Sequence, residues 1–374
     1  MHVVQANLLP LPPGRAHADM LGEWHSLVDI AEIAASAGTR ISVVQAAWRQ
    51  DRIVRNGIEY HFLDIAALHE PERSRRLAAM LSGLGADLLH VHGLAFAEDA
   101  CAVARRLPRL PLLCQDHADG VPRWWRRRRW RRWHSAVAAV SFTSTEQARP
   151  FIDARVLGDG ARVFAIPEST SRFTPGDRKR ARTDTGMHGD PCVAWVGHLA
   201  HHKDPLTVID GVAGAASRLP GLQMWCAFGT APLLQAVQAR IAAHPVLADR
   251  VHLLGRLPHA QVEAMMRASD LFVSGSRAEG GGYALMEAIA CGTTPVVTDI
   301  PAFRALTGGG TVGRLWPVGD PRRLSAALVD AALQPPLRDA VRAHFEATLS
   351  FAAIGRRWAT TYAEVAARHA RGLE

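Results

Sequence analysis

The sequence predicts an α/β protein built from two doubly wound parallel sheets. Short apolar runs alternate with helical patterns along almost the whole chain, which is typical of repeated strand–helix–strand units. The alternation stops over residues 167–190, where Pro, Ser, Thr, Gly, Arg and Asp dominate, and then resumes. Because a chain of 374 residues more often forms two domains than one, we expect a first domain at 1–170, a linker at 171–190 and a second domain at 191–349.

The first half contains a series of short apolar strands separated by amphipathic helices. We expect strands at 3–8, 41–44, 60–63, 87–92, 111–115 and 162–166, and helices at 23–37, 70–84 and 96–106. Ligands of such sheets bind beyond the carboxyl ends of the strands. Gly14 and His117 both follow a predicted strand, so both are placed on the side where a ligand would bind.

The second half repeats the pattern, and most of its strands end in glycine or a small polar residue. We expect strands at 192–196, 222–228, 251–254, 270–274 and 294–298, and helices at 205–216, 231–243, 259–268, 321–333 and 350–370. A further helix of small residues is expected to end at Cys291 and Gly292. Small residues at strand ends suit an edge that faces a ligand.

Composition excludes several classes of protein. There is no apolar run of about eighteen residues, so we expect no membrane-spanning helix, and the N-terminus does not resemble a signal peptide. The five cysteines form no CxxC pair, which argues against a zinc or redox motif and favours reduced core thiols in a cytoplasmic protein (Cys101, Cys114, Cys192, Cys226 and Cys291). The net charge of +8 permits an anionic partner without selecting one.

Residues 279–287 form the most informative segment of the chain. Three consecutive glycines, 280–282, lie between a strand and a helix, where backbone amides can approach a ligand closely and the helix N-terminus attracts anions. Glu279 precedes the glycines, and Glu287 lies about one turn into the helix. Amides would bind phosphates and the carboxylates would bind sugar hydroxyls, so the pattern favours a nucleotide sugar as ligand.

With these motifs in place, the second half resembles the retaining glycosyltransferases of the GT-B fold, most closely glycosyltransferase family 4. Residues 279–287 match the E-x7-E motif of these enzymes, residues 196–204 resemble their G-R-L-x-x-x-K-G/D segment, and residues 254–257 resemble the segment that passes the nucleotide base. The order and spacing of the three segments fit the family. The resemblance covers residues 190–330 strongly, and it covers the first half mainly through Gly14 and His117.

This resemblance implies two Rossmann-like domains that face a central cleft, with the acceptor on the first domain and the nucleotide sugar on the second. It implies transfer of a hexosyl group with retention and without a bound metal or other cofactor, since the nucleotide sugar is a co-substrate. It also implies that the helix at 350–370 packs back on the first domain. Family frequency favours a UDP-sugar, and the acceptor is a small molecule, a glycan or a lipid-linked molecule.

The resemblance also assigns roles to residues. It places Glu279 and His117 near the donor sugar as the catalytic pair, and Glu287 on the ribose. The remaining donor-binding residues are Gly14, His198, Lys203, Arg256, Leu257, Gly281, Gly282 and Tyr283. Lys203 and the amides of the glycine loop would neutralise the leaving diphosphate, because no metal would do so. Arg256 and Leu257 would lie near the base, while Asp116 and Asp119 are rival acceptor contacts.

The sequence departs from the family at one position, where His198 replaces the arginine of G-R-L. Arginine is a permanent forked cation suited to phosphate, whereas histidine is neutral much of the time near pH 7. Stabilisation of the diphosphate is therefore weaker, sensitive to pH, or supplied by another basic group such as His201 or His202. A binding or scaffold protein of the same fold is the alternative from another class, and a nucleotide-sugar epimerase is a second alternative.

Residues 123–133 contain seven arginines and four tryptophans. Three interpretations compete. The run is a surface helix that packs tryptophans on the core, a patch that contacts anionic lipid at the inner membrane face, or a site for a polyanion such as nucleic acid. The context of Glu279 and Glu287 argues against nucleic acid as the main partner.

Overall fold

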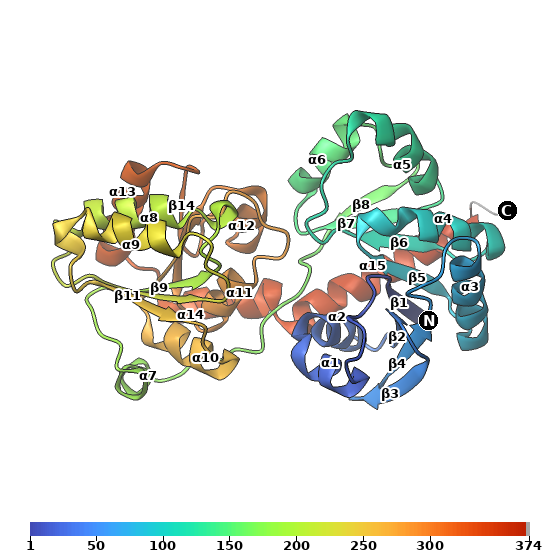
Figure 1. Cartoon of the computed structure of the whole chain (residues 1–374), viewed down its shortest axis with the longest axis horizontal. Helices are drawn as coiled ribbons and strands as arrows, with labels where there is room; N and C mark the ends of the chain where they lie inside the picture. The colour runs from blue at the N-terminus through green and yellow to red at the C-terminus, as the bar shows by residue number, and fades with distance from the viewer. Residues whose placement is uncertain (372–374) are drawn as a thin grey trace. The chain divides into compact units, whose positions relative to one another are not determined.

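The computed structural model describes residues 1–371, apart from the side chains of Glu23, His25 and Ser26. The chain forms two compact units (Figure 1). Unit 1 comprises Met1–Thr170 together with the C-terminal segment that begins at Phe351, and unit 2 comprises Ser171–Ser350. Each unit is a mainly parallel sheet covered by helices, which confirms the predicted α/β class.

Within the described residues, the sheet of unit 1 has eight strands in the order β3-β4-β2-β1-β5-β6-β7-β8. Their bounds are β1 His2–Asn7, β2 Arg40–Ala47, β3 Asp51–Arg55, β4 Ile58–Asp64, β5 Leu88–His92, β6 Leu112–Gln115, β7 Ala139–Phe142 and β8 Arg162–Ala165. The chain leaves β1 toward β2 on one side and later returns to β5 on the other, so strand order reverses between β1 and β5. Such a switch point is where α/β sheets bind ligands.

The helices of unit 1 are α1 His17–Glu23, α2 His25–Ala35, α3 Glu72–Leu84, α4 Ala97–Arg106, α5 Arg127–His134, α6 Thr145–Asp153 and α15 Phe351–Arg371. The helix expected at 23–37 is α2, whereas the separate helix α1, which ends before Trp24, was not anticipated. Strand β3 was not anticipated. It pairs antiparallel with β4 through Asn56 and Gly57, which both have positive φ, as a tight hairpin requires.

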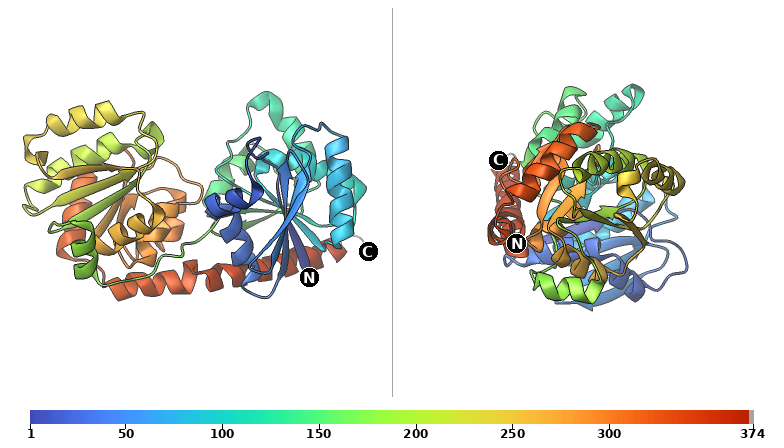
Figure 2. Two further views of the ribbon diagram at one scale, coloured as in Figure 1. Left: turned by 60° about the horizontal axis from the view of Figure 1, so that its bottom comes forward. Right: turned by 90° about the vertical axis from the view of Figure 1, so that its left-hand side faces the viewer.

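The long C-terminal helix α15 belongs to unit 1 (Figure 2). Trp358 and Tyr362 are fully buried in its core, and the Tyr362 hydroxyl bonds Nδ1 of His90 at 2.9 Å. Gly355 lets α15 approach α2 closely, because a Cβ at that position would lie 2.6 Å from the carbonyl oxygen of Ile33.

Unit 2 has a six-stranded parallel sheet, among the described residues, in the order β11-β10-β9-β12-β13-β14. Its strands are β9 Cys192–Gly197, β10 Gln223–Phe228, β11 Val251–Gly255, β12 Leu271–Ser274, β13 Thr294–Thr298 and β14 Arg314–Trp316. Its helices are α7 Arg178–Thr185, α8 Pro205–Ala216, α9 Leu234–Ala242, α10 His259–Ala268, α11 Tyr283–Ala290, α12 Pro301–Leu306, α13 Pro321–Leu333 and α14 Arg338–His344. Central strands β9 and β12 lie side by side, so the segments that follow them meet at one edge.

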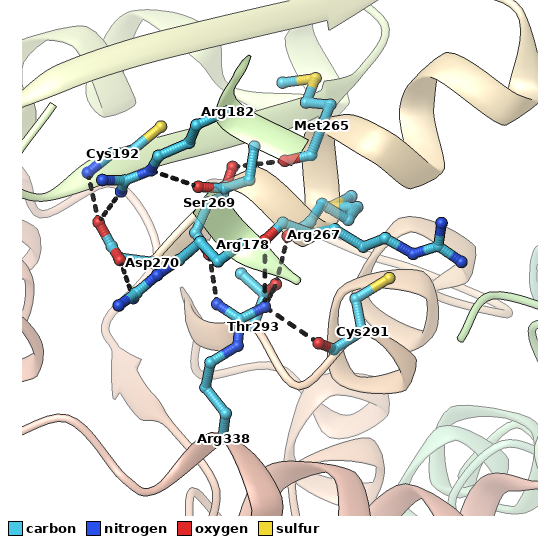
Figure 3. A network of polar contacts seen from close by, with 12 residues as sticks. Arg178, Arg182, Cys192, Met265, Arg267, Ser269, Asp270, Cys291, Thr293 and Arg338 are labelled. Carbon is cyan, nitrogen blue, oxygen red and sulfur yellow. Dashed lines mark hydrogen bonds and ion pairs between the residues drawn. The ribbon is translucent and has the colours of Figure 1, made fainter. Parts of the chain in front are cut away.

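The segment 171–190, expected to be a linker, contains helix α7 and belongs to unit 2. Figure 3 shows the network that fixes it: the Asp270 carboxylate accepts hydrogen bonds from Arg178 and Arg182 of α7, and also from the backbone N–H of Cys192 at 2.8 Å. In the same network Arg338 of α14 donates to the carbonyl oxygen of Ser269 at 2.7 Å. The polar composition of α7 therefore reflects ion pairs with the domain body rather than a free linker.

All five cysteines are free and buried. Burial raises the pKa of the Cys114, Cys226 and Cys291 thiols to about 12, so these three are not thiolates at neutral pH. Among residues 1–371, no helix is both long enough and apolar enough to cross a membrane.

Candidate functional site

Unit 2 contains a cavity of about 330 Å³ at the carboxyl ends of β9 and β12. Its lining includes six of the residues singled out from the sequence: His198, Lys203, Glu279, Gly282, Tyr283 and Glu287. The apolar part of the lining consists of Val196, Phe272, Ala284, Leu285 and Phe303. The structure therefore brings together residues that are up to 89 positions apart in the sequence, His198 and Glu287 being the most distant pair of the six.

The glycine loop at 280–282 leads into the first turn of α11, and this turn lines the cavity. Gly282 caps α11 with φ +65°, and a Cβ there would lie 2.7 Å from Cδ1 of the buried Leu306. Glycine is thus needed both for the backbone angle and for the close approach. The first turn of a helix presents backbone N–H groups that attract anions, so this wall of the cavity favours a phosphate. Gly281 precedes the cap and is not part of the cavity wall.

Lys203 and Glu279 form an ion pair within the cavity. Ser276 also donates a hydrogen bond to Oε1 of Glu279, at 2.6 Å. Lys203 precedes α8, whose first turn is capped by Asp204, and Asp204 accepts a further hydrogen bond from Arg277 at 2.6 Å. The sequence assigned Lys203 and Glu279 to different parts of the donor. The structure instead places them in contact, where each charge is balanced by the other.

Glu287 is paired with a histidine that the sequence analysis did not single out. His259 Nε2 lies 3.0 Å from Oε1 of Glu287, and the His259 ring packs against Phe173 at a centroid distance of 4.6 Å. His259 begins α10, two residues after Leu257, so its only sequence signal was its nearness to the expected base-binding segment. Arg256 is exposed and Leu257 packs on the core of unit 2, and neither lines the cavity.

His198 accepts a backbone hydrogen bond at the edge of the cavity. Its Nδ1 accepts the backbone N–H of Thr230 at 3.1 Å, so the ring proton of the neutral form is on Nε2. Burial lowers the pKa of His198, and the nearby charges of Lys203 and His202 lower it further. His201 and His202 are exposed and do not line the cavity, so neither takes the place of the missing arginine there.

Unit 1 contains a second cavity, of about 390 Å³, at the carboxyl ends of β1, β5 and β6. It is lined by Asn7, Leu9, Trp24, Leu27, Ile30, His92, Gly93, Phe96, His117 and Asp119. His117 and Asp119 were expected from the sequence. Gly14 lies in the exposed loop between β1 and α1 with φ +81° and does not line this cavity.

Asp116 is buried and has a structural role. Its carboxylate accepts the backbone N–H groups of Asp119 at 2.9 Å and Ala118 at 3.3 Å, which closes the turn after β6. Burial raises the pKa of Asp116 to about 6, against the effect of these two amides. The expected contact between Asp116 and an acceptor is therefore not supported by its position, since Asp116 does not line the cavity.

His117 is held between a carboxylate and a second histidine. Its Nδ1 lies 2.7 Å from Oε1 of Glu168, and its Nε2 lies 3.0 Å from Nδ1 of His92. Burial by itself lowers the pKa of His117, but the hydrogen bond and charge of Glu168 outweigh it, and the net pKa is raised. His92 is buried, and its pKa lies well below the ordinary value because of burial and two neighbouring histidines. Glu168 carried no sequence signal, since its segment reads as irregular.

The Arg/Trp run folds as a short 3-10 turn, Trp124–Arg126, followed by α5. Trp130 is buried in the core of unit 1, whereas Trp124 and Trp125 are 75% and 57% exposed. The two exposed rings meet edge to face at 5.7 Å. Only the second half of the run therefore fits the interpretation of a helix that packs tryptophans on the core.

Unit 2 is similar to a family of known proteins. Residues 177–344 match the family of glycosyl transferases group 1. The matched segment covers nearly all of unit 2, which holds the cavity with Lys203 and Glu279.

Two relatives illustrate how far the group 1 similarity extends. The 2-deoxystreptamine N-acetyl-D-glucosaminyltransferase of Streptomyces fradiae is 30% identical over 264 residues, which cover 66% of this chain and 62% of that protein. The phosphatidyl-myo-inositol mannosyltransferase of Mycobacterium tuberculosis is 28% identical over 188 residues, which cover 50% of this chain and 48% of that protein. The chain thus spans about half to three fifths of the length of these relatives.

Solved structures extend the similarity in fold to both units of the chain. Sucrose-phosphate synthase of Thermosynechococcus elongatus has a TM-score of 0.73 at 17% identity and covers 98% of this chain and 99% of its own. HepE of Anabaena in complex with UDP has a TM-score of 0.71 at 18% identity, with 97% and 100% covered. The chain therefore has the GT-B fold of two Rossmann-like domains, which confirms the fold that the resemblance implied.

Proposed function

We propose that this protein is a glycosyltransferase that moves a hexosyl group from a nucleotide-diphosphate sugar to an acceptor. The observation that carries the proposal is the unit 2 cavity, in which the Lys203–Glu279 ion pair faces the first turn of α11. A cation and a helix N-terminus in one cavity suit a diphosphate, and the neighbouring carboxylates suit the hydroxyls of two sugars. The group 1 match of the same residues supports this interpretation.

Each residue has a distinct part in this proposal. Lys203 and the α11 amides stabilise the negative charge that develops on the leaving diphosphate. His198 donates one hydrogen bond from Nε2 to a phosphate oxygen. Glu279, released from Lys203 as the phosphate takes its place, binds the donor sugar, and Glu287 binds the ribose. Retention and independence from metal follow the resemblance, and UDP is favoured because HepE, a neighbour in fold, binds UDP and UDP-glucose.

The test combines donor binding with turnover. Thermal shift against UDP-, GDP-, ADP- and dTDP-sugars identifies the nucleotide, since a ligand that binds only the folded state raises Tm. Lys203→Met and Glu279→Gln are expected to abolish donor hydrolysis and transfer while leaving the protein folded. Lys179→Met is the matched control, because Lys179 is exposed on α7 far from the cavity lining. Unchanged turnover in both cavity variants would overturn the site assignment.

The same experiment separates the two alternatives. A binding or scaffold protein would be stabilised by a nucleotide sugar but would not turn it over, in line with the replacement of arginine by His198. An epimerase would convert the sugar of the donor without any acceptor, which product analysis detects.

We further propose that residues 123–133 contact anionic lipid at the inner membrane face. Trp124 and Trp125 are exposed beside arginines, and Arg123 stacks over the Trp125 ring at 5.3 Å. Of the seven arginines in the run, the described residues give only Arg131 a carboxylate partner, Asp159. Exposed indoles with uncompensated cations are typical of interfacial segments. Cosedimentation with phosphatidylglycerol vesicles tests this contact. Binding should be lost in the double variant Trp124→Ala/Trp125→Ala and retained in Trp48→Ala. Equal binding of the unaltered protein to phosphatidylcholine vesicles would contradict the proposal.

A further inference from the structure

The unit 1 cavity has one apolar wall. Its apolar side chains come from the loop after β1, from the start of α2 and from the turn after β5: Leu9, Trp24, Leu27, Ile30 and Phe96. An indole, a phenyl ring and three aliphatic side chains in one lining favour the flat, apolar face of a ring. A volume of about 390 Å³ accommodates a small ligand of one or two rings.

The polar part of the lining lies at the switch point of the sheet. Asn7 ends β1, His92 ends β5, and His117 and Asp119 follow β6. These three strands are neighbours in the order β1-β5-β6, so the four side chains converge because of the topology. The sequence separates Asn7 from His92 by a large part of the first domain.

Two polar atoms in this part of the lining remain available to a ligand. Asp119 uses Oδ2 to accept the backbone N–H of Leu94 at 2.7 Å, and no protein hydrogen bond to its Oδ1 is found among the described residues. His92 uses Nδ1 for its contact with His117 and also interacts with Gln115, but no hydrogen bond of 3.5 Å or less to its Nε2 is found among the described residues. A carboxylate oxygen accepts only, so the ligand group beside Asp119 must be a hydrogen-bond donor.

The tautomer of His92 depends on the state of His117. Glu168 requires a proton on Nδ1 of His117. When His117 is neutral, its Nε2 accepts from His92 Nδ1–H, and His92 Nε2 is then an acceptor. When His117 is protonated, its Nε2–H donates to His92, and the His92 proton moves to Nε2. A hydroxyl satisfies either state because it both donates and accepts, whereas a phosphate oxygen satisfies only one.

The charges around the cavity also disfavour an anion. No lysine or arginine contributes to its lining within the set of described side chains. The positive charge of His117 is balanced by Glu168, and Asp119 adds a carboxylate. The unit 2 cavity, in contrast, contains Lys203 and a helix N-terminus. Phosphate sites are normally built from such cations and amides.

The resemblance places the acceptor on the first domain, and we propose that the unit 1 cavity selects as acceptor a phosphate-free hydroxy compound with an apolar ring face. The ring packs between Trp24 and Phe96, and a hydroxyl lies between Asp119 and His92. Calling this ligand an acceptor rests on the proposed glycosyltransferase function. The cavity and its preference for this class of ligand do not depend on a donor.

Calorimetric titration of the full-length protein without nucleotide tests the preference. The probes are phenyl β-D-glucoside, glucose and glucose 6-phosphate. We expect phenyl β-D-glucoside to bind at least about tenfold more tightly than glucose 6-phosphate, and Trp24→Ala to weaken its binding by about tenfold. Trp124→Ala is the matched control, since it removes an exposed indole outside the cavity. Leu9→Arg, at an exposed position on the rim, is expected to raise the affinity for glucose 6-phosphate.

Three results would overturn the proposal. They are no binding of phenyl β-D-glucoside, equal or tighter binding of glucose 6-phosphate to the unaltered protein, and equal losses in Trp24→Ala and Trp124→Ala. If Trp24→Ala fails to fold, as circular dichroism would show, Leu9→Arg alone decides the outcome by its effect on glucose 6-phosphate. The donor thermal shift is run in parallel, so failure of the acceptor class is distinguished from failure of the glycosyltransferase function.

Discussion

His117 donates a hydrogen bond from Nδ1 to Oε1 of Glu168, 2.7 Å away. Glu168 lies two residues before Thr170, where the first segment of unit 1 ends. The bond therefore joins the loop after β6 to the last residues of the first segment of unit 1. Because a carboxylate only accepts, Glu168 fixes the proton on Nδ1 and directs Nε2 of His117 to His92.

Glu168→Gln should lower the pKa of His117 and flatten the pH dependence of stability. The folded pKa of His117 is raised, so its contribution to stability is complete below the unfolded value of about 6.5 and is lost as pH rises through the folded pKa. Removing the charge should cost about 1–3 kcal/mol at pH 6. Urea unfolding from pH 5 to 9 measures this effect. Glu98→Gln, at an exposed position of α4, is the control, and a profile unchanged by Glu168→Gln would contradict the pairing.

His198→Arg should strengthen donor binding and remove its dependence on pH. Burial lowers the pKa of His198, so the wild-type ring is cationic only in acid, and UDP binding should improve as the pH falls. A permanent guanidinium should raise UDP affinity about tenfold near pH 7 and give a flat profile. Calorimetric titration with UDP at several pH values measures both effects. His69→Arg, at an exposed position of unit 1 outside the cavity, should change neither, and a pH-independent wild type would refute the expectation.

Lys203 and Glu279 should be coupled in stability. Lys203→Met and Glu279→Gln each leave one charge without its partner in a half-buried site, and the double variant removes both charges. A double-mutant cycle in urea should give a coupling free energy of about 1–3 kcal/mol, with the double variant less destabilised than the sum of the singles. All three variants should lose turnover. Additive losses of stability would show that the ion pair does not persist in solution.

Gly282→Ala should destabilise unit 2 by about 1–3 kcal/mol. The substitution combines a positive φ with a Cβ 2.7 Å from the buried Leu306 side chain. Gly319→Ala is matched in φ, at +75°, but its Cβ would meet nothing within 4 Å. The difference in unfolding free energy between the two variants therefore isolates the close contact. Equal losses would place the whole effect in the backbone angle.

Much of the fold could be predicted because its signals are local. In unit 2, the predicted helices at 205–216 and 259–268 agree with α8 and α10, since glycine and proline mark their limits and apolar periodicity fills them. Edge strand β3 was missed because its half-exposed pattern has no apolar run. Helix α7 was missed because arginines that pair with Asp270 across 88 and 92 positions resemble a solvated segment.

The sequence by itself determined the parallel α/β class, the glycine loop at 280–282 and the candidates Lys203, Glu279 and Glu287, because the two local segments β9–α8 and β12–α11 contain them. Only the tertiary structure decided their partners. His117 meets Glu168 across 51 positions and Glu287 meets His259 across 28 positions. It likewise placed Trp24 and Phe96 around one cavity and left Gly14 and Arg256 outside the two cavities described. Contacts of this kind depend on which strands become neighbours in a sheet, and strand order is a property of the whole domain rather than of any local pattern.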